Sequence, residues 1–81
     1  MFRDIDKAQT GLKLKQFRIG CKLKQRDVAD NLQVTQTTIS NIECGSVNLT
    51  MDNAIKFAQL YQCKLDDFIT LESFKEVVKK Q

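Results

Sequence analysis

The stretch that decides the fold runs from Gln25 to Gly45 and reads QRDVADNLQVTQTTISNIECG. Its apolar residues form two short groups at helical spacing, namely Val28, Ala29 and Leu32, and then Val34, Ile39 and Ile42. A turn falls between the groups, near Gln33 and Val34, and Gly45 is a natural stop after the second group. The spacing therefore predicts two helices of about eight residues that meet at a tight turn. The small Ala29 allows them to cross at a steep angle.

The second helix would turn an uncharged polar face outward. Its side chains are Gln36, Thr37, Ser40 and Asn41, with Thr35 and Thr38 near the start of the helix. This face could simply be solvated, but Thr and Asn are mediocre helix formers, and exposed helix faces favour Glu, Lys and Ala. A reader of the DNA major groove needs such side chains, because Gln or Asn bonds an adenine edge and a Thr methyl group contacts a thymine methyl group. The pattern favours a helix that reads bases in the major groove over a merely solvated face.

The rest of the chain also has helical spacing. It contains no proline, and its glycines are confined to positions 11, 20 and 45. A first helix is predicted from about Lys7 to Ile19, with the stripe Leu14, Phe17 and Cys21 and a stop at Gly20. Thr50 is the expected N-cap of a fourth helix, whose predicted buried face consists of Met51, Ala54, Ile55, Ala58 and Tyr61.

A fifth helix is expected to start with Leu65 and Phe68, and a sixth would carry the apolar stripe Leu71, Phe74, Val77 and Val78. We therefore predict an all-α fold, a compact five-helix bundle with an extra C-terminal helix. Residues 1–70 would form one DNA-binding domain, with its helix-turn-helix at about 24–43, and residues 71–81 would form a C-terminal tail.

Positive charge is concentrated in the first third of the chain. The 81 residues carry a net charge of +3, but residues 1–33 hold eight Lys or Arg and four Asp or Glu, a balance of +4. Residues 34–49 contain one charge, Glu43, and residues 50–81 hold five of each sign. A basic surface beside an uncharged polar helix is typical of a nucleic-acid partner, although a solvated helix face would have the same charge.

Other classes of protein fit the composition poorly. No apolar run has the length of a membrane span. Charged residues stand near the N-terminus, where a signal peptide would have an apolar stretch. Without any histidine, an enzyme is not expected, and neither a metal site nor a cofactor is predicted. Cys21, Cys44 and Cys63 lack metal-ligand spacing and are expected to be free, buried or half-buried thiols in the cytoplasm. A catalytic thiol with Lys22 beside Cys21 is a weaker alternative.

Residues 11–69 resemble the helix-turn-helix family of phage repressors and Cro proteins, often called the XRE family. The residues that carry the resemblance are spaced along most of the chain: Gly11, Leu14, Phe17, Arg18, Leu23, Gln25, Ala29, Leu32, Val34, Thr35, Thr38, Ile39, Ile42, Glu43, Gly45, Thr50, Met51, Asp52, Ile55, Ala58, Leu65, Asp66, Asp67 and Phe68. The family usually has glycine where this chain has Lys22, Gln33 and Gln62. These three residues are therefore expected to adopt positive φ angles, which strain a residue that has a Cβ atom.

The resemblance implies roles for individual residues. The helix from Thr35 to Glu43 would lie in the major groove, with base readers Gln36, Thr37, Asn41 and Ser40. DNA backbone contacts would come from Gln25, Thr35, Thr38, Lys22, Lys24, Ser46 and Asn48, and Gln25 could also brace the recognition helix. Arg18 and Glu43 would form a structural ion pair rather than contact DNA.

The sequence thus predicts a sequence-specific transcriptional regulator that binds double-stranded DNA, a repressor acting as a homodimer on a two-fold-symmetric operator. With no Lys or Arg in the recognition helix, the operator is expected to be rich in A·T pairs at the positions that face Gln36 and Asn41. The tail residues Leu71, Phe74, Val77 and Val78 would form the dimer interface or fold back onto their own domain. The alternative is an antitoxin or another interaction module whose main role is to bind a partner protein and whose DNA binding is secondary.

Overall fold

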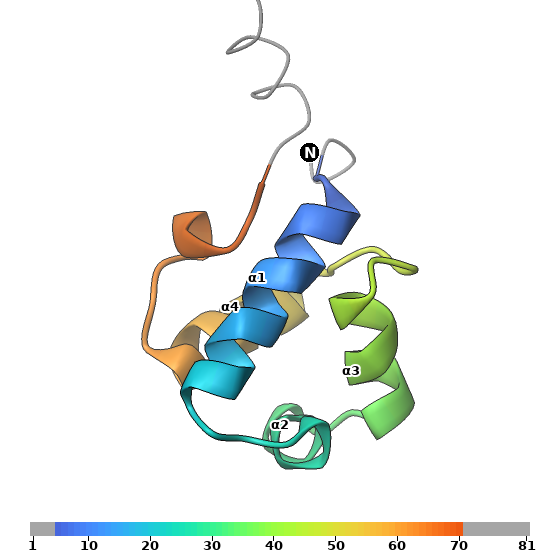
Figure 1. Ribbon diagram of the computed structural model, residues 1–81, viewed down its shortest axis with the longest axis vertical. Helices are drawn as coiled ribbons and strands as arrows, with labels where there is room; N and C mark the ends of the chain where they lie inside the picture. The colour runs from blue at the N-terminus through green and yellow to red at the C-terminus, as the bar shows by residue number, and fades with distance from the viewer. Residues whose placement is uncertain (1–4, 71–81) are drawn as a thin grey trace, which may run out of the picture.

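The computed structural model describes residues 5–70, which form four α-helices and one short 3₁₀ turn (Figure 1). The helices are α1 (Lys7–Gly20), α2 (Gln25–Leu32), α3 (Gln36–Glu43) and α4 (Met51–Tyr61), followed by the 3₁₀ turn Leu65–Asp67. Between residues 5 and 70 there is no strand, and the predicted all-α class is confirmed. The predicted sixth helix and the tail interface of Leu71, Phe74, Val77 and Val78 lie outside the described residues.

Short polar side chains define where three helices begin. The side chain of Asp6 accepts a hydrogen bond from the Gln9 amide at the start of α1, at 3.1 Å. Thr35 accepts one from the Thr38 amide at the start of α3, and Thr50 caps α4 as predicted. Each such N-cap satisfies an amide that has no partner within its own helix, which stabilises a helix by about 1 kcal/mol.

The turns after α1, α2 and α4 have the left-handed backbone that the family resemblance implied. Lys22, Gln33 and Gln62 all have positive φ angles, of 59°, 60° and 53°. Gln33 ends α2, and its amide donates to the carbonyl of Asp30 while the Val34 amide donates to that of Ala29. A residue with a Cβ atom in this conformation costs roughly 1 kcal/mol relative to glycine.

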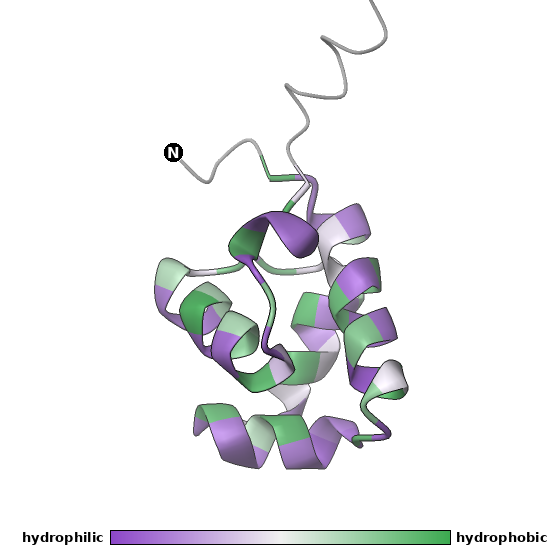
Figure 2. Ribbon diagram, turned by 90° about the vertical axis from the view of Figure 1, so that its left-hand side faces the viewer, coloured by the Kyte–Doolittle hydropathy of each residue, from purple (hydrophilic) through white to green (hydrophobic). Residues whose placement is uncertain are grey.

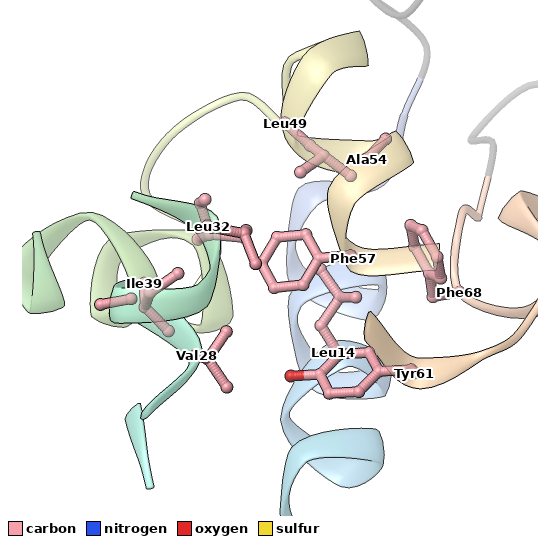
Figure 3. Packing of buried hydrophobic residues seen from close by; sticks show 11 residues of the cluster. Leu14, Val28, Leu32, Ile39, Leu49, Ala54, Phe57, Tyr61 and Phe68 are labelled. Atoms are coloured by element: carbon pink, nitrogen blue, oxygen red, sulfur yellow. The ribbon is translucent and has the colours of Figure 1, made fainter. Parts of the chain in front are cut away.

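The core lies where all four helices meet. Figure 2 shows apolar residues on the inner sides of the helices and polar residues on their outer sides. In Figure 3, Phe57 occupies the centre of the cluster, with Val28, Leu32 and Ile39 on one side and Phe68 on the other. Phe57 also stacks against Tyr61, whose ring in turn stacks on Phe17 of α1 with the ring centroids 5.6 Å apart.

The predicted orientation of α4 is wrong by part of a turn. Met51 and Ile55 are exposed, and Phe57, which the spacing left out, is completely buried together with Ala54 and Tyr61. Apolar residues surround most of the circumference of α4, so their spacing fits more than one inner face. Phe57 packs in one buried cluster with Leu32 of α2 and Phe68, and this packing determines which face is buried.

Two further expectations need correction. The fifth helix is only the 3₁₀ turn Leu65–Asp67, begun by the Asp67 carboxylate, which accepts from the Lys64 amide, and held by the buried Phe68. Cys21 and Cys44 are exposed because they lie just past the last turns of α1 and α3, and only Cys63 is half-buried. All three thiols are free.

The last described residue is attached to the beginning of α1. The Asp6 amide donates to the Thr70 carbonyl, and the Thr70 amide donates to the hydroxyl of the buried Thr10 at 3.1 Å. These bonds close the bundle, since residues sixty positions apart meet at one end of α1. No helix within residues 5–70 is long and apolar enough to cross a membrane.

Candidate nucleic-acid interface

The outer side of α3 presents the uncharged polar side chains that the sequence singled out. Gln36, Thr37 and Ser40 are exposed, and Asn41 is half-buried, while Ile39 on the opposite side is fully buried. The side chains of Gln36, Thr37, Ser40 and Asn41 hydrogen-bond to no other residue in the described part of the chain. Their amide and hydroxyl groups are therefore available to a ligand along the length of α3.

The start of α3 is more constrained than this outer face. Thr35 is both the N-cap and the partner of Thr38, because the two hydroxyl groups lie 2.9 Å apart and the Thr38 amide also donates to Thr35. Each hydroxyl group keeps spare hydrogen-bonding capacity, since a hydroxyl can donate once and accept twice. Thr35 is exposed and Thr38 half-buried, which leaves both beside the start of the polar face.

The inner side of α3 is held by a charged cluster. The Arg18 guanidinium donates to both carboxylate oxygens of Glu43, with Nε–Oε2 at 2.7 Å and Nη2–Oε1 at 3.2 Å. Gln25 donates from Nε2 to the same carboxylate at 3.1 Å, and Arg18 also donates to the carbonyl of Leu23. This cluster ties the end of α3 to α1 and to the first residue of α2.

Burial makes this cluster costly to break. The Glu43 side chain is only 3% exposed, and that of Arg18 is 12% exposed. A carboxylate so buried is tolerated only while it is paired and hydrogen-bonded, and removing one partner of such a pair costs about 3–5 kcal/mol. The expected geometry of a structural ion pair is thus present, and it uses three of the five N–H donors of Arg18, counting the bond to Leu23.

A close backbone contact fixes the same helices at a second point. A Cβ atom added to Gly11 of α1 would lie 2.4 Å from the Ile42 carbonyl oxygen and 2.6 Å from that of Glu43. Only glycine permits this approach of α1 to the last turn of α3. Together with the pair of Arg18 and Glu43, the contact prevents α3 from rotating or sliding on the bundle.

The residues expected at the DNA backbone are distributed around the polar face. Lys22 and Lys24 are exposed at the turn between α1 and α2, and Asn48 is exposed in the loop after α3. Gln25 is half-buried and already uses one amide hydrogen on Glu43. The Ser46 hydroxyl donates to the Asn41 carbonyl at 3.2 Å, so it serves as a cap for α3 and has no second proton for a phosphate.

Two residues that were not predicted as part of the DNA site lie beside predicted ones. Lys15 of α1 and Cys44 after α3 line a surface depression together with Gln25, Ser40 and Glu43. The spacing offered one signal for Lys15, because it precedes Arg18 by three residues and so lies on the same side of α1. Nothing in the spacing indicated Cys44.

The described residues contain no group of three or more Cys, Asp or Glu side chains arranged to hold a metal ion. Burial raises the pKa of the Cys63 thiol, and the nearby Asp67 and Cys21 add to this effect. A thiol with a raised pKa is a poor nucleophile at neutral pH.

Comparison with known proteins agrees with this geometry. The helix-turn-helix family model HTH_3 matches residues 14–68, and the chain belongs to this family of XRE-type helix-turn-helix proteins. A comparison with curated protein sequences finds no significant match.

Several solved structures share the fold. The chain is similar to the restriction-modification controller protein C.AhdI from Aeromonas hydrophila, with a TM-score of 0.73, 21% identity, and coverage of 78% of this chain and 96% of that one. It is also similar to the clp gene regulator ClgR from Corynebacterium glutamicum, with a TM-score of 0.73, 18% identity, and coverage of 76% and 66%. The DNA-binding domain of BldD gives a TM-score of 0.69, 20% identity, and coverage of 79% and 93%.

At these identities the structural likeness establishes the fold. Membership of the helix-turn-helix family supports DNA binding and a role as a transcription regulator. In that family arrangement α2 and α3 are the two helices of the motif, and α3 is the one whose outer face carries free polar side chains.

Proposed function

We propose that this protein is a sequence-specific transcriptional repressor that binds a two-fold-symmetric DNA operator as a homodimer. The observation that carries the proposal is the outer face of α3, which offers uncharged polar side chains with no partner among the described residues. The Arg18–Glu43 pair and the Gly11 contact hold that face in one orientation. A rigid scaffold of this kind is what base-specific hydrogen bonding requires.

We assign base reading to Gln36, Thr37 and Asn41. Gln and Asn can bond the N6 and N7 edge of adenine with two hydrogen bonds, and the Thr37 methyl group can contact thymine. Helix α3 (Gln36–Glu43) contains no Lys or Arg, the side chains that form two hydrogen bonds to guanine. The operator positions facing α3 are therefore A·T pairs.

Contacts with the DNA backbone would position α3 in the major groove. Lys22 and Lys24 supply positive charge beside the start of α2, and Gln25, Thr35, Thr38 and Asn48 add polar groups around α3. Phosphate contacts fix register and orientation but carry no sequence information. Ser46 contributes by capping α3, since its hydroxyl is already used.

A dimer follows from the small size of the reading surface. One α3 helix of eight residues reads only a few base pairs, and two copies on half-sites about 34 Å apart would double the contacts. The tail residues Leu71, Phe74, Val77 and Val78 remain our candidates for the interface between the copies.

Selection from a library of randomised DNA duplexes tests this function. We expect a short symmetric consensus with A·T pairs in each half-site, bound about a thousandfold more tightly than random DNA. Sedimentation of the complex should show two protein chains on each duplex. Weak binding without a consensus, or guanine-rich half-sites, would contradict the proposal.

A further inference from the structure

A groove follows α1 on the side of the helix that faces away from α3. Its lining residues are Lys13, Gln16, Phe17 and Gly20 of α1, Cys21 just after it, and Asp67 of the 3₁₀ turn. We call it the α1 groove. Its volume is about 440 Å³, which is within the range of sites that hold a ligand. Figure 1 shows the orange 3₁₀ turn and α3 on opposite sides of α1, so an occupant of the groove would leave the polar face of α3 free.

The floor of the α1 groove is apolar and only partly covered. Phe17 stacks on Tyr61 with the ring centroids 5.6 Å apart, but the Phe17 side chain is half-buried rather than buried. A Cβ atom added to Gly20 would meet no other atom within 4 Å, so no described residue fills the space beside it. Because burying apolar surface is favourable, a partly covered ring beside an open glycine suits an apolar side chain.

The C-terminal tail carries an apolar stripe of matching length. Leu71, Phe74, Val77 and Val78 lie outside the described residues, but their sequence spacing is that of one helix face. On a helix, the stripe from Leu71 to Val78 is about 10 Å long, and the α1 groove from Lys13 to Cys21 is about 12 Å long. The stripe and the groove therefore fit each other along their length.

Charged side chains at the edge of the α1 groove also suit the tail. One oxygen of the Asp67 carboxylate accepts a hydrogen bond from the Lys64 amide, and the carboxylate forms no ion pair with a described residue. On a tail helix, Lys75 would follow Leu71 by one turn and so border the apolar stripe. Lys75 could then approach Asp67 while the stripe enters the groove.

The path of the chain decides which copy supplies the tail. Tyr61 stacks on Phe17 and Thr70 bonds to Thr10, so the chain between Tyr61 and Thr70 follows α1 from its second half back to its start (Figure 1). The tail thus continues from the far end of α1. Residues 71–81 contain no glycine, proline, asparagine or aspartate, which are the residues that most readily reverse a chain. Reaching the groove of its own chain would require such a reversal, and reaching that of a second copy would not.

We propose that two copies of this chain exchange tails, so that the apolar stripe of each copy docks in the α1 groove of the other. The inference rests on the homodimer of the proposed function and names the surfaces that join its copies. Each copy gives one tail and receives one, so the exchange is self-complementary and closes at two copies. Both polar faces of α3 stay available to DNA, because the groove and α3 lie on opposite sides of α1.

Two variants block the exchange from its two sides. Gly20→Glu places a charged side chain in the groove at a position with open space, and Phe74→Ser removes the aromatic anchor of the tail. Dimerisation of the reduced protein without DNA is measured by sedimentation equilibrium. Each variant removes both contacts of the dimer, so its Kd should rise by about a hundredfold or more. The controls Gly20→Ala and Ser73→Ala should stay within about threefold of the wild type, and melting temperatures verify that every variant folds.

Mixing the two blocked variants separates exchange from a tail that folds onto its own domain. In a mixed dimer, the intact tail of the Gly20→Glu copy enters the intact groove of the Phe74→Ser copy. One of the two contacts is restored, so the mixture should dimerise about tenfold more tightly than either variant alone. A fluorescent label on one variant identifies the mixed species. If mixing restores no dimer, the tails are not exchanged and the proposal is wrong.

A tryptophan at position 74 reports where the tail lies. The chain has no tryptophan, so Phe74→Trp supplies a single indole. Its emission should shift to the blue as the protein concentration rises through the dimer Kd, because the indole leaves water. Adding Gly20→Glu should abolish the shift. Blue-shifted emission that does not change with concentration would mean that the tail occupies its own chain, which contradicts the exchange.

The exchange and the proposed function can fail separately. If both blocked variants dimerise weakly and their mixture recovers, but no DNA consensus is selected, the exchange stands and sequence-specific repression fails. If a symmetric consensus is selected while Gly20→Glu and Phe74→Ser dimerise like the wild type, the proposed function stands and the exchange is overturned. A wild type that remains monomeric at every concentration also overturns the exchange.

Discussion

The two sides of α3 differ in what holds their side chains. On the inner side, Ile39 and Ile42 are buried and Glu43 is bonded to two other helices. On the outer side, Gln36 and Thr37 extend into solvent without a partner in the described chain. Substitutions on the inner side should therefore change stability, and substitutions on the outer side should change recognition.

The difference shows how one short helix serves two purposes. Eight residues are too few to form a stable helix alone, so α3 depends on its inner contacts for its existence. Because those contacts fix its orientation, the outer side chains need no internal bonds and can be chosen for the ligand.

Arg18→Ala should have the largest effect on stability. It leaves the Glu43 carboxylate, whose side chain is 3% exposed, with Gln25 as its remaining side-chain partner. We expect the free energy of unfolding, measured by urea denaturation, to fall by about 3–5 kcal/mol. The double variant Arg18→Met with Glu43→Leu removes both charges and should lose clearly less. A loss below about 1 kcal/mol for Arg18→Ala would show that the pair does not hold α3.

Gly11→Ala should have the next largest effect. The added Cβ atom would collide with the carbonyl oxygens of Ile42 and Glu43 and push α1 away from α3, which costs about 2 kcal/mol. Gly20→Ala is the matched control, because a Cβ atom added there would have no other atom within 4 Å. Since alanine is the better helix former, that variant should gain up to about 1 kcal/mol. Equal changes in melting temperature for the two variants would refute a specific close contact at Gly11.

Gln33→Gly should act in the opposite direction. Gln33 has a φ of 60° at the turn between α2 and α3, so glycine relieves strain that is only partly offset by its greater freedom in the unfolded chain. The expected gain is up to about 1 kcal/mol, seen as a rise of a few degrees in melting temperature. An unchanged or lower melting temperature would mean that the turn does not benefit from glycine.

Tyr61→Phe should have the smallest effect at neutral pH. The Tyr61 hydroxyl is buried without a hydrogen-bond partner among the described residues, so its removal should be neutral or stabilise by up to about 1 kcal/mol. Burial, aided by the nearby Glu43, raises the pKa of Tyr61 above its ordinary value. Above about pH 10 the unfolded chain would release the phenolic proton while the folded chain keeps it, so wild-type stability should fall as pH rises.

Chemical denaturation between about pH 9 and pH 11 checks this dependence. Tyr61→Phe should show a shallower decrease over that range than the wild type, because it lacks the titrating phenol. The same slope in both proteins would show that the buried hydroxyl is not linked to folding.

Local signals predicted much of the fold. Thr50 marked the start of α4 and Gly20 the end of α1 correctly, because caps and stops depend on a few neighbouring residues. The buried face of α4 could not be read in this way, since Met51, Ile55 and Phe57 are equally apolar and only their packing partners distinguish them.

The interface was less accessible to sequence reasoning. The polar face of α3 follows from helical spacing alone, but the pairing of Arg18 with Glu43 came from the family resemblance. That Lys15 lies beside Gln25, Ser40 and Glu43 follows only from the packing of α1, α2 and α3 around one surface depression. Contacts between residues far apart in the chain are set by tertiary structure, which periodicity does not encode.

The most direct test of the central claim compares Asn41→Ala with Lys24→Ala on the selected duplex and on a random duplex of the same length. If the outer side of α3 reads bases, Asn41→Ala will reduce the preference for the selected duplex by about 1–3 kcal/mol. Lys24→Ala will weaken both duplexes equally and keep that preference. If Asn41→Ala also weakens both duplexes equally, α3 does not read sequence and the account is contradicted.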